Sequence, residues 1–233
     1  MIYICPHFDG MGPEMAPFCR LYAYPVAPEP PPPGGVVILD SGAWALAQQG
    51  RRIGPEHMKR LAEHYRRYAG GAVHAIAPDV YLDPAATMHN WEWWQKNVGF
   101  RVVPVIQFPH EHKLDFYAAY RQARFYTRWS PRVVAISNPG LQASECAELI
   151  EQVCAIVREV TGATWLHNLG AGWSPQDIRR WREIECFESI DSVAYYTDAQ
   201  QHRCWRTDGG ITPDDPRPWR EIAVENARVA QEV

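Results

Sequence analysis

The sequence predicts an α/β protein built as a (β/α)8 TIM-type barrel, and it leaves open whether the last strand is incomplete or irregular. Short apolar segments alternate with helical segments at intervals of about 25–35 residues, the spacing of repeated βαβ units. The apolar segments end in polar or turn residues, as buried parallel strands do. No glycine-rich dinucleotide-binding loop follows the first strands, which favours a barrel over an open doubly wound sheet.

Length and composition fit a single domain over residues 1–233. A chain of 233 residues can bury one large core, and α/β barrels commonly have this length. Its hydrophobic content of 46% and charged content of 21% are typical of folded proteins and exclude a disordered chain. The net charge of −4 gives no whole-chain attraction for nucleic acid, so such binding would need a local basic patch.

The cysteines and the apolar segments indicate the cellular compartment. The six cysteines form no CxxC pair and no tight cluster with histidine, which predicts reduced thiols in an intracellular, cytoplasmic protein. The N-terminus lacks the pattern of a signal peptide. No apolar segment approaches the roughly 20 residues of a membrane span, so we expect no membrane association.

Apolar side chains define the expected strands, seven in all. The first covers residues 1–5, and the second is the run of four apolar residues that ends at Asp40. The remaining strands are expected at 73–77, 101–107, 132–137, 164–169 and 189–195. No eighth strand is visible in the sequence.

Two long loops are expected, because proline and glycine interrupt the pattern. Residues 6–35 contain the four prolines 30–33, which cannot form a helix or a central strand. This segment is either a spacer or a lid over one end of the domain. Residues 197–217 are polar and include Gly209 and Gly210, so they are expected to form a second loop.

Capping residues mark the expected helices. Asp83, Ser144 and Ser174 are expected N-caps, Pro55 suits a first turn, and Gly162 follows a helix end. The helices are expected at 55–68, 84–97, 114–129, 144–160, 174–185 and 218–232.

Polar residues stand at the carboxyl ends of successive strands. Asp40 ends one strand, Asp79 follows the next, Gln107 ends a third, and Asp191 lies in the last. In a barrel these ends converge on one mouth, where catalytic residues gather. Each acid alone can also be a cap or turn residue. Their shared position on successive strands favours a site.

Three carboxylates and an amide at one mouth suit glycosyl transfer. One carboxylate can attack an anomeric carbon while another moves a proton. A third carboxylate and a glutamine can hydrogen-bond the edge of a purine. The glycine-rich turns at Gly140 and Gly170 would let backbone N–H groups approach a base carbonyl.

These residues resemble motifs of the tRNA-guanine transglycosylase superfamily, including its compact phage and bacterial relatives that insert 7-deazaguanines into DNA. Asp40-Ser41-Gly42-Ala43-Trp44 resembles the family's Asp-Ser-Gly-Gly/Ala-aromatic motif. Residues 169–175 resemble its Gly-x-Gly-x-Pro turn, and Ile190-Asp191-Ser192 resembles the strand that carries its nucleophile. The resemblance covers residues 36–196, most of the chain.

The resemblance implies a role for each matching residue. Asp191 would attack C1′ of the target nucleotide, and Asp40 would act as general acid and base. Asp79 and Gln107 would bind the guanine or 7-deazaguanine base. The remaining residues would complete the substrate pocket: Gly140 through its N–H, Leu169 against the base face, and Gly170, Ser41 and Gly42 around them. The target base must leave the stack to be reached.

The sequence also departs from the family. Its tRNA-acting members carry a zinc site of three cysteines and a histidine after the nucleophile strand, whereas only His202 and Cys204 occur in that region here. The turn after Ser137 reads Asn138-Pro139-Gly140 instead of Gly-Gly. We therefore expect DNA as substrate more than tRNA, and neither a metal nor a cofactor.

Several alternatives remain open. The same residues also suit a hydrolase of nucleosides or other small N-glycosides, or a non-catalytic partner subunit that binds a nucleobase or nucleic acid. A homodimer is also compatible with the sequence. The presence of both Asp40 and Asp191 favours the enzyme, since a binding module needs no nucleophile.

Three further features have competing interpretations. The basic cluster of Arg51, Arg52, Lys59, Arg60, Arg66 and Arg67 could follow a phosphate backbone or form a solvated helix face. His110-Glu111-His112 resembles part of a metal site but lacks a third partner. Trp91, Trp93 and Trp94 could stack on bases, although core packing is favoured because Trp91 and Trp94 share a helix face.

Overall fold

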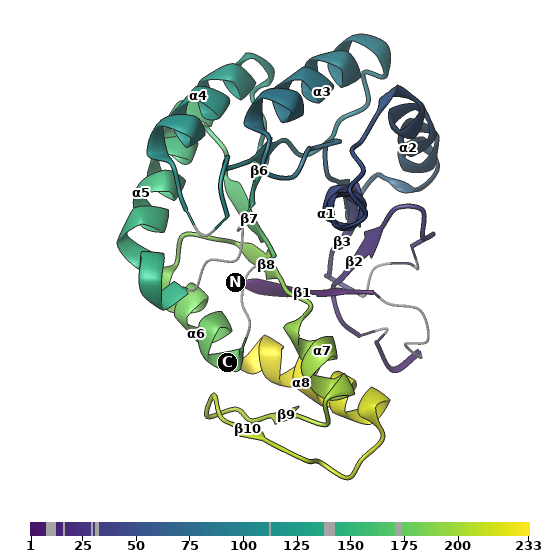
Figure 1. Cartoon of the computed structure of the whole chain (residues 1–233), viewed down its shortest axis with the longest axis vertical. Coiled ribbons are helices and arrows are strands. Elements are labelled where there is room, and N and C mark those ends of the chain that lie inside the picture. The colour runs from purple at the N-terminus through teal and green to yellow at the C-terminus, as the bar shows by residue number, and fades with distance from the viewer. Residues whose placement is uncertain are drawn as a thin grey trace.

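The computed structural model describes residues 1–7, 13–15, 17–28, 30, 33–111, 113–137, 143–170 and 174–233. Within these ranges, eight parallel strands form one curled sheet that alternates with helices, as in an incomplete TIM-type barrel (Figure 1). The strands are β1 (Ile2–Pro6), β2 (Arg20–Ala23), β3 (Val37–Asp40), β4 (Val73–Ala75), β5 (Val105–Ile106), β6 (Val133–Ser137), β7 (Trp165–Leu169) and β8 (Ser189–Asp191). The predicted fold class is therefore confirmed.

The strands lie side by side in chain order, and the first strand pairs with the last. The sheet order is β4-β3-β2-β1-β8-β7-β6-β5, with Ile4 of β1 opposite Asp191 of β8. Its two edge strands approach each other at an isolated parallel bridge between Ile76 and Val103. Val103 N donates to Ala75 O at 2.7 Å there. Pro104 follows at once and has no N–H to extend the ladder, so the sheet is incomplete at this seam.

The strand that the sequence did not reveal is β2, which lies inside the segment expected to be a loop at 6–35. It pairs with both β1 and β3. The sequence concealed it because it is short, begins with a charged residue and is flanked by prolines. Arg20 is nevertheless 2% exposed, and its Nη2 donates to Pro30 O at 2.8 Å. A tertiary contact thus makes a buried arginine acceptable in the strand.

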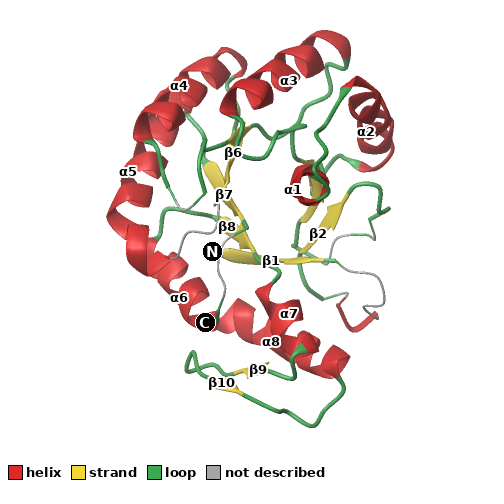
Figure 2. Ribbon diagram, viewed as in Figure 1, coloured by secondary structure: helices red, strands yellow, loops and turns green. Residues whose placement is uncertain are grey.

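Helices surround the strands (Figure 2). Asp83 and Ser174 cap their helices as expected, accepting from Ala86 N at 2.9 Å and Asp177 N at 3.2 Å. Ser144 lies inside its helix, one residue after the start, so it is not the N-cap. The helices are α1 (Ala43–Gln48), α2 (Pro55–Tyr68), α3 (Pro84–Asn97), α4 (Phe116–Tyr126), α5 (Ala143–Thr161), α6 (Pro175–Ile184), α7 (Ala194–Gln200) and α8 (Trp219–Glu232).

The region after Asp191 differs from the expectation. The strand expected over 189–195 ends at Asp191, and helix α7 follows. The expected loop at 197–217 contains the end of α7 and a short antiparallel hairpin, β9 (Cys204–Trp205) and β10 (Ile211–Thr212). Contacts distant in sequence stabilise this hairpin, since Trp205 N donates to Asn226 Oδ1 of α8 at 2.7 Å.

The core has two layers. Ile4, Leu21, Ile38 and Val105 belong to a cluster that fills the inside of the sheet. A larger cluster joins the strands to the helices and includes Trp91 and Trp94, which are 3% and 0% exposed. The core interpretation of these two tryptophans is confirmed. Among the described residues, no helix is both long enough and apolar enough to cross a membrane.

Candidate active site at the carboxyl ends of the strands

Asp40 is held by the turn that follows β3. Gly42 N donates to Asp40 Oδ2 at 3.0 Å, and Ala43 N donates to Ser41 Oγ at 3.2 Å. Gly42 has φ +77°, a left-handed conformation that side chains other than glycine rarely adopt. The Asp-Ser-Gly-Ala motif is therefore a tight turn whose backbone conformation directs an N–H at the Asp40 carboxylate.

Asp79 joins the turn to Gln107. Ser41 Oγ donates to Asp79 Oδ1 at 2.6 Å, and Gln107 Nε2 donates to Asp79 Oδ2 at 2.7 Å. Asp79 and Gln107 are 5% and 2% exposed. The three residues come from three successive strand ends, as the sequence predicted, and here they bind one another.

Asp191 is the last member of a hydrogen-bonded chain inside β7 and β8. Trp165 Nε1 donates to Ser189 Oγ at 2.7 Å, and Ser189 Oγ lies 2.9 Å from His167 Nδ1. His167 Nε2 lies 3.1 Å from Asp191 Oδ1. Gly170 N also donates to Oδ1, at 3.2 Å.

One arrangement of protons satisfies every member of this chain. An indole N–H can only donate, so Ser189 Oγ accepts from Trp165, and a carboxylate can only accept, so His167 Nε2 donates to Asp191. In the neutral imidazole Nδ1 is then an acceptor, and the Ser189 hydroxyl donates to it. Asp191 Oδ2 is the carboxylate oxygen without a hydrogen-bond donor among the described residues.

The carboxylates influence one another electrostatically. Burial, followed by the nearby Asp79 carboxylate, raises the pKa of Asp40 to about 7, and Asp191 contributes in the same direction. Burial also raises the pKa of Asp79, while the hydrogen bonds from Ser41 and Gln107 oppose that rise. A carboxyl with a pKa near 7 can both donate and accept a proton at neutral pH.

The structure brings together most of the residues predicted for the site. Asp40, Ser41, Gly42, Asp79 and Gln107 form one network. Asp191 and Gly170 form another, and Leu169 ends the strand beside it. Gly140 lies outside the described residues, as do Ala171 and Gly172 of the second glycine turn.

Sequence reasoning missed the residues that support Asp191 and Gln107. Ser189 stands two positions before Asp191 on the same side of β8, and this alternation is a signal that could have found it. His167 stands two positions before the end of β7 at Leu169, where the only signal is a histidine inside an apolar strand. Gln122 of α4 donates to Gln107 O at 2.8 Å and accepts from Gln107 N at 2.9 Å. A single glutamine in the middle of a helix offers no such signal.

Two other polar regions of the chain contain ion pairs. In the basic cluster after β3, Lys59 pairs with Glu56 at 2.7 Å and Arg52 pairs with Asp83 at 3.0 Å, which supports a solvated face. A hollow of about 460 Å³ between the β9–β10 hairpin and α8 is also lined by ion pairs: Arg206 with Asp208, Arg217 with Asp215, and Arg228 with Glu225.

Within the described part of the chain, no group of three or more histidine, cysteine, aspartate or glutamate side chains is arranged to hold a metal ion. His112 of the His110-Glu111-His112 sequence lies outside that part, whereas the Glu111 carboxylate accepts from Tyr81 Oη at 3.2 Å.

A scan against protein-family models found no match to the chain, and a search of curated proteins also found none. The functional inferences therefore depend on the residues and their geometry.

Proposed function

We propose that the chain is a transglycosylase that exchanges guanine for a 7-deazaguanine-type base in nucleic acid, with DNA favoured over tRNA. One observation carries the proposal: Asp40 and Asp191 stand at the same mouth in different environments. Burial and neighbouring carboxylates raise the pKa of Asp40 to about 7, whereas Asp191 accepts from His167 and Gly170. Two carboxyl groups in unlike environments can divide proton transfer and nucleophilic attack between them.

The reaction proceeds in two displacements. Asp191 Oδ2 attacks C1′ of the target nucleotide, the bond from C1′ to the base breaks, and the protonated Asp40 gives its proton to the leaving guanine. The incoming base then gives a proton to the Asp40 carboxylate and attacks C1′, which releases Asp191. Asp40 ends protonated, as it began, so the cycle needs no cofactor.

The base would be bound by the network of Asp79 and Gln107. Both side chains are buried and bind each other, so an entering base must replace their mutual hydrogen bond with its own. The preference for DNA depends on the region after Asp191. The cysteine and histidine there are engaged within the protein: Arg217 donates to Cys204 Sγ at 3.0 Å, and His202 Nδ1 lies 2.9 Å from Asp215 O.

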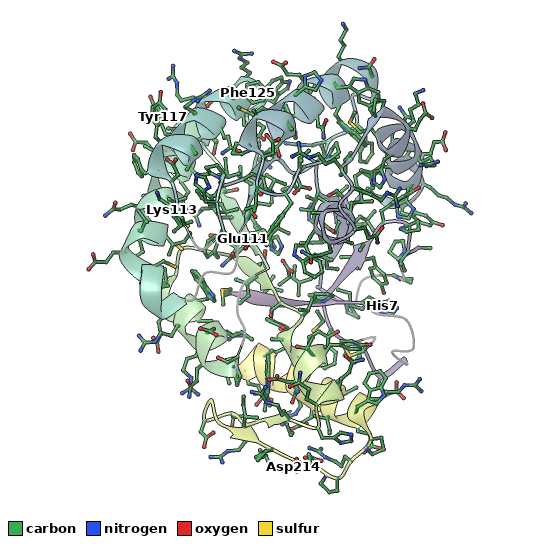
Figure 3. The ribbon with its side chains drawn as sticks, in the orientation of Figure 1. His7, Glu111, Lys113, Tyr117, Phe125 and Asp214 are labelled. Carbon is green, nitrogen blue, oxygen red and sulfur yellow. The ribbon has the colours of Figure 1, made fainter. Side chains whose placement is uncertain are left out.

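Base exchange is the direct test. The protein is incubated with DNA or, separately, tRNA, together with labelled guanine or the 7-deazaguanine preQ0. Label should enter DNA with the native protein and with Asp214→Asn, a control that changes an exposed carboxylate far from the mouth (Figure 3). Asp191→Ala and Asp40→Asn should lose incorporation.

Three other results would each change the proposal. Incorporation into tRNA alone would reverse the polymer preference. Release of free base without incorporation would indicate hydrolysis of N-glycosides. Absence of both, with the protein folded and several bases tried, would contradict a catalytic role and favour a binding subunit.

A further inference from the structure

The outer face of α4 combines exposed aromatic rings with arginines. Phe116, Tyr117 and Tyr120 are 44%, 67% and 37% exposed. Arginines occupy the following exposed positions of the same segment, at Arg121, Arg124 and Arg128. We call these six residues the α4 face. Figure 3 shows Tyr117 on α4 at the outer rim of the molecule.

The opposite side of α4 is part of the candidate site. Ala119, Ala123 and Tyr126 are buried against the barrel, and Gln122 holds the backbone of Gln107 with two hydrogen bonds. In a barrel each helix runs back from the mouth at which its strand ended, so the first turn of α4 lies at the mouth end. The α4 face therefore begins at the mouth end of the barrel and extends away from it.

The charge of the α4 face is not balanced locally. Residues 116–129 contain three arginines and no acidic residue. Arg121 and Arg128 lie 5.8 and 5.6 Å from the ring centres of Tyr117 and Phe125, which are cation–π contacts. In the described part of the chain, the ion pairs involve other basic residues, including Lys59 of α2. Helix α2 also contains two acidic residues, Glu56 and Glu63, and in this the α4 face differs from it.

We propose that the α4 face binds single-stranded nucleic acid and guides it to the mouth. Guanidinium groups without carboxylate partners suit phosphates, and exposed tyrosine rings suit stacking on unpaired bases. The bases of a duplex are stacked on one another and are not accessible to the tyrosine rings. We therefore infer a single-stranded polymer. This inference rests on the proposed function for the identity of the polymer.

Binding can be measured without catalysis. Fluorescence anisotropy with a labelled oligothymidylate of 20 nucleotides, which contains no guanine, reports on the surface alone. We expect Arg121→Ala/Arg124→Ala to weaken binding by about tenfold or more and to reduce the slope of log Kd against log salt by about 1.4, or 0.7 per lost phosphate contact. Tyr117→Ala/Tyr120→Ala should weaken binding by about tenfold while leaving the salt slope unchanged.

Arg60→Ala/Arg66→Ala on α2 is the matched control, because it removes the same charge from an exposed helix face. It should change Kd by less than about twofold. Equal losses from the two arginine pairs would show general electrostatic attraction and overturn the inference, as would tighter binding of a duplex than of the single strand. Unchanged melting temperatures establish that the variants are folded.

The two proposals fail separately. If base exchange on DNA is observed but the α4 variants bind and exchange normally, the α4 inference is wrong and the enzymatic proposal stands. If no polymer is modified but the α4 variants alone lose binding to oligothymidylate, the surface is confirmed and the enzymatic proposal is wrong.

Discussion

Asp40 and Asp191 both end strands of the barrel, but their surroundings come from different parts of the chain. The backbone N–H that holds Asp40 belongs to Gly42, two residues away in the same turn. The groups that hold Asp191 are His167 and Gly170, more than twenty residues earlier. One carboxylate is thus positioned by a local motif and the other by a contact between strands.

This difference has a chemical consequence. Burial and then the nearby Asp79 carboxylate raise the pKa of Asp40, so the proton is retained up to about pH 7. The chain from Trp165 through Ser189 to His167 instead directs a fixed N–H at Asp191. If the two carboxylates have separate roles, replacing each of them should affect the rate, its pH dependence and the stability differently.

Removing Asp191 should have the largest effect. Asp191→Ala deletes the proposed nucleophile, and we expect base exchange to fall by about 10⁴-fold or more. A covalent protein–nucleic acid adduct, detected by denaturing gel electrophoresis, should form with the native protein and be absent from the variant. An adduct retained by Asp191→Ala would assign the nucleophile to another residue.

Asp40→Asn should lower the rate by about 10²–10⁴-fold, because it removes the group that transfers the proton. The pH–rate profile of the native protein should contain an apparent pKa near 7, which follows from the raised pKa of Asp40. The change in rate around that pKa should be missing from the profile of the variant. If Asp40→Asn keeps the same change in rate, another group is responsible for it.

The same substitution should affect stability in a pH-dependent way. The pKa of Asp40 rises from 3.8 to about 7 on folding, so the folded state retains a proton that the unfolded state releases. Asp40 therefore makes the protein progressively less stable as pH rises from about 4 to about 7. The asparagine variant should gain more stability relative to the native protein at pH 8 than at pH 4 in urea unfolding. An equal difference at both pH values would contradict the raised pKa.

His167→Ala should reduce kcat by about 10–100-fold with little change in KM, because the Asp191 carboxylate loses the donor that orients it. His167→Gln restores a side-chain N–H near the same position and should recover part of the rate. Recovery distinguishes orientation from a general loss of packing. If the two variants are equally active, His167 serves the fold alone.

Gly42→Ser should produce the smallest change, a loss of about 1–2 kcal/mol in unfolding free energy. The residue has φ +77°, where a side chain is strained, and its backbone holds Asp40. Gly54→Ser is the control, since Gly54 has φ −112° at the start of α2, where serine is favoured. Similar melting temperatures for the two variants would show that the turn does not require glycine.

The site residues could be predicted from patterns that are visible in the sequence. Asp40, Asp79, Gln107 and Asp191 were found because parallel strands end at one mouth, and this follows from the alternation of strands and helices alone. The Asp-Ser-Gly-Ala turn could be found for the same reason, since its donor and acceptor lie two residues apart.

Sequence patterns alone predicted the α/β barrel class, most helix boundaries and the set of carboxylates at the strand ends. Three features were visible only in the folded chain: Arg20 begins strand β2, the chain after Asp191 turns into helix α7, and His167 faces Asp191. The physical reason is the range of the interactions. Caps, turns and apolar periodicity act within a few residues, whereas a buried arginine or histidine is satisfied by partners that only the folded chain brings near.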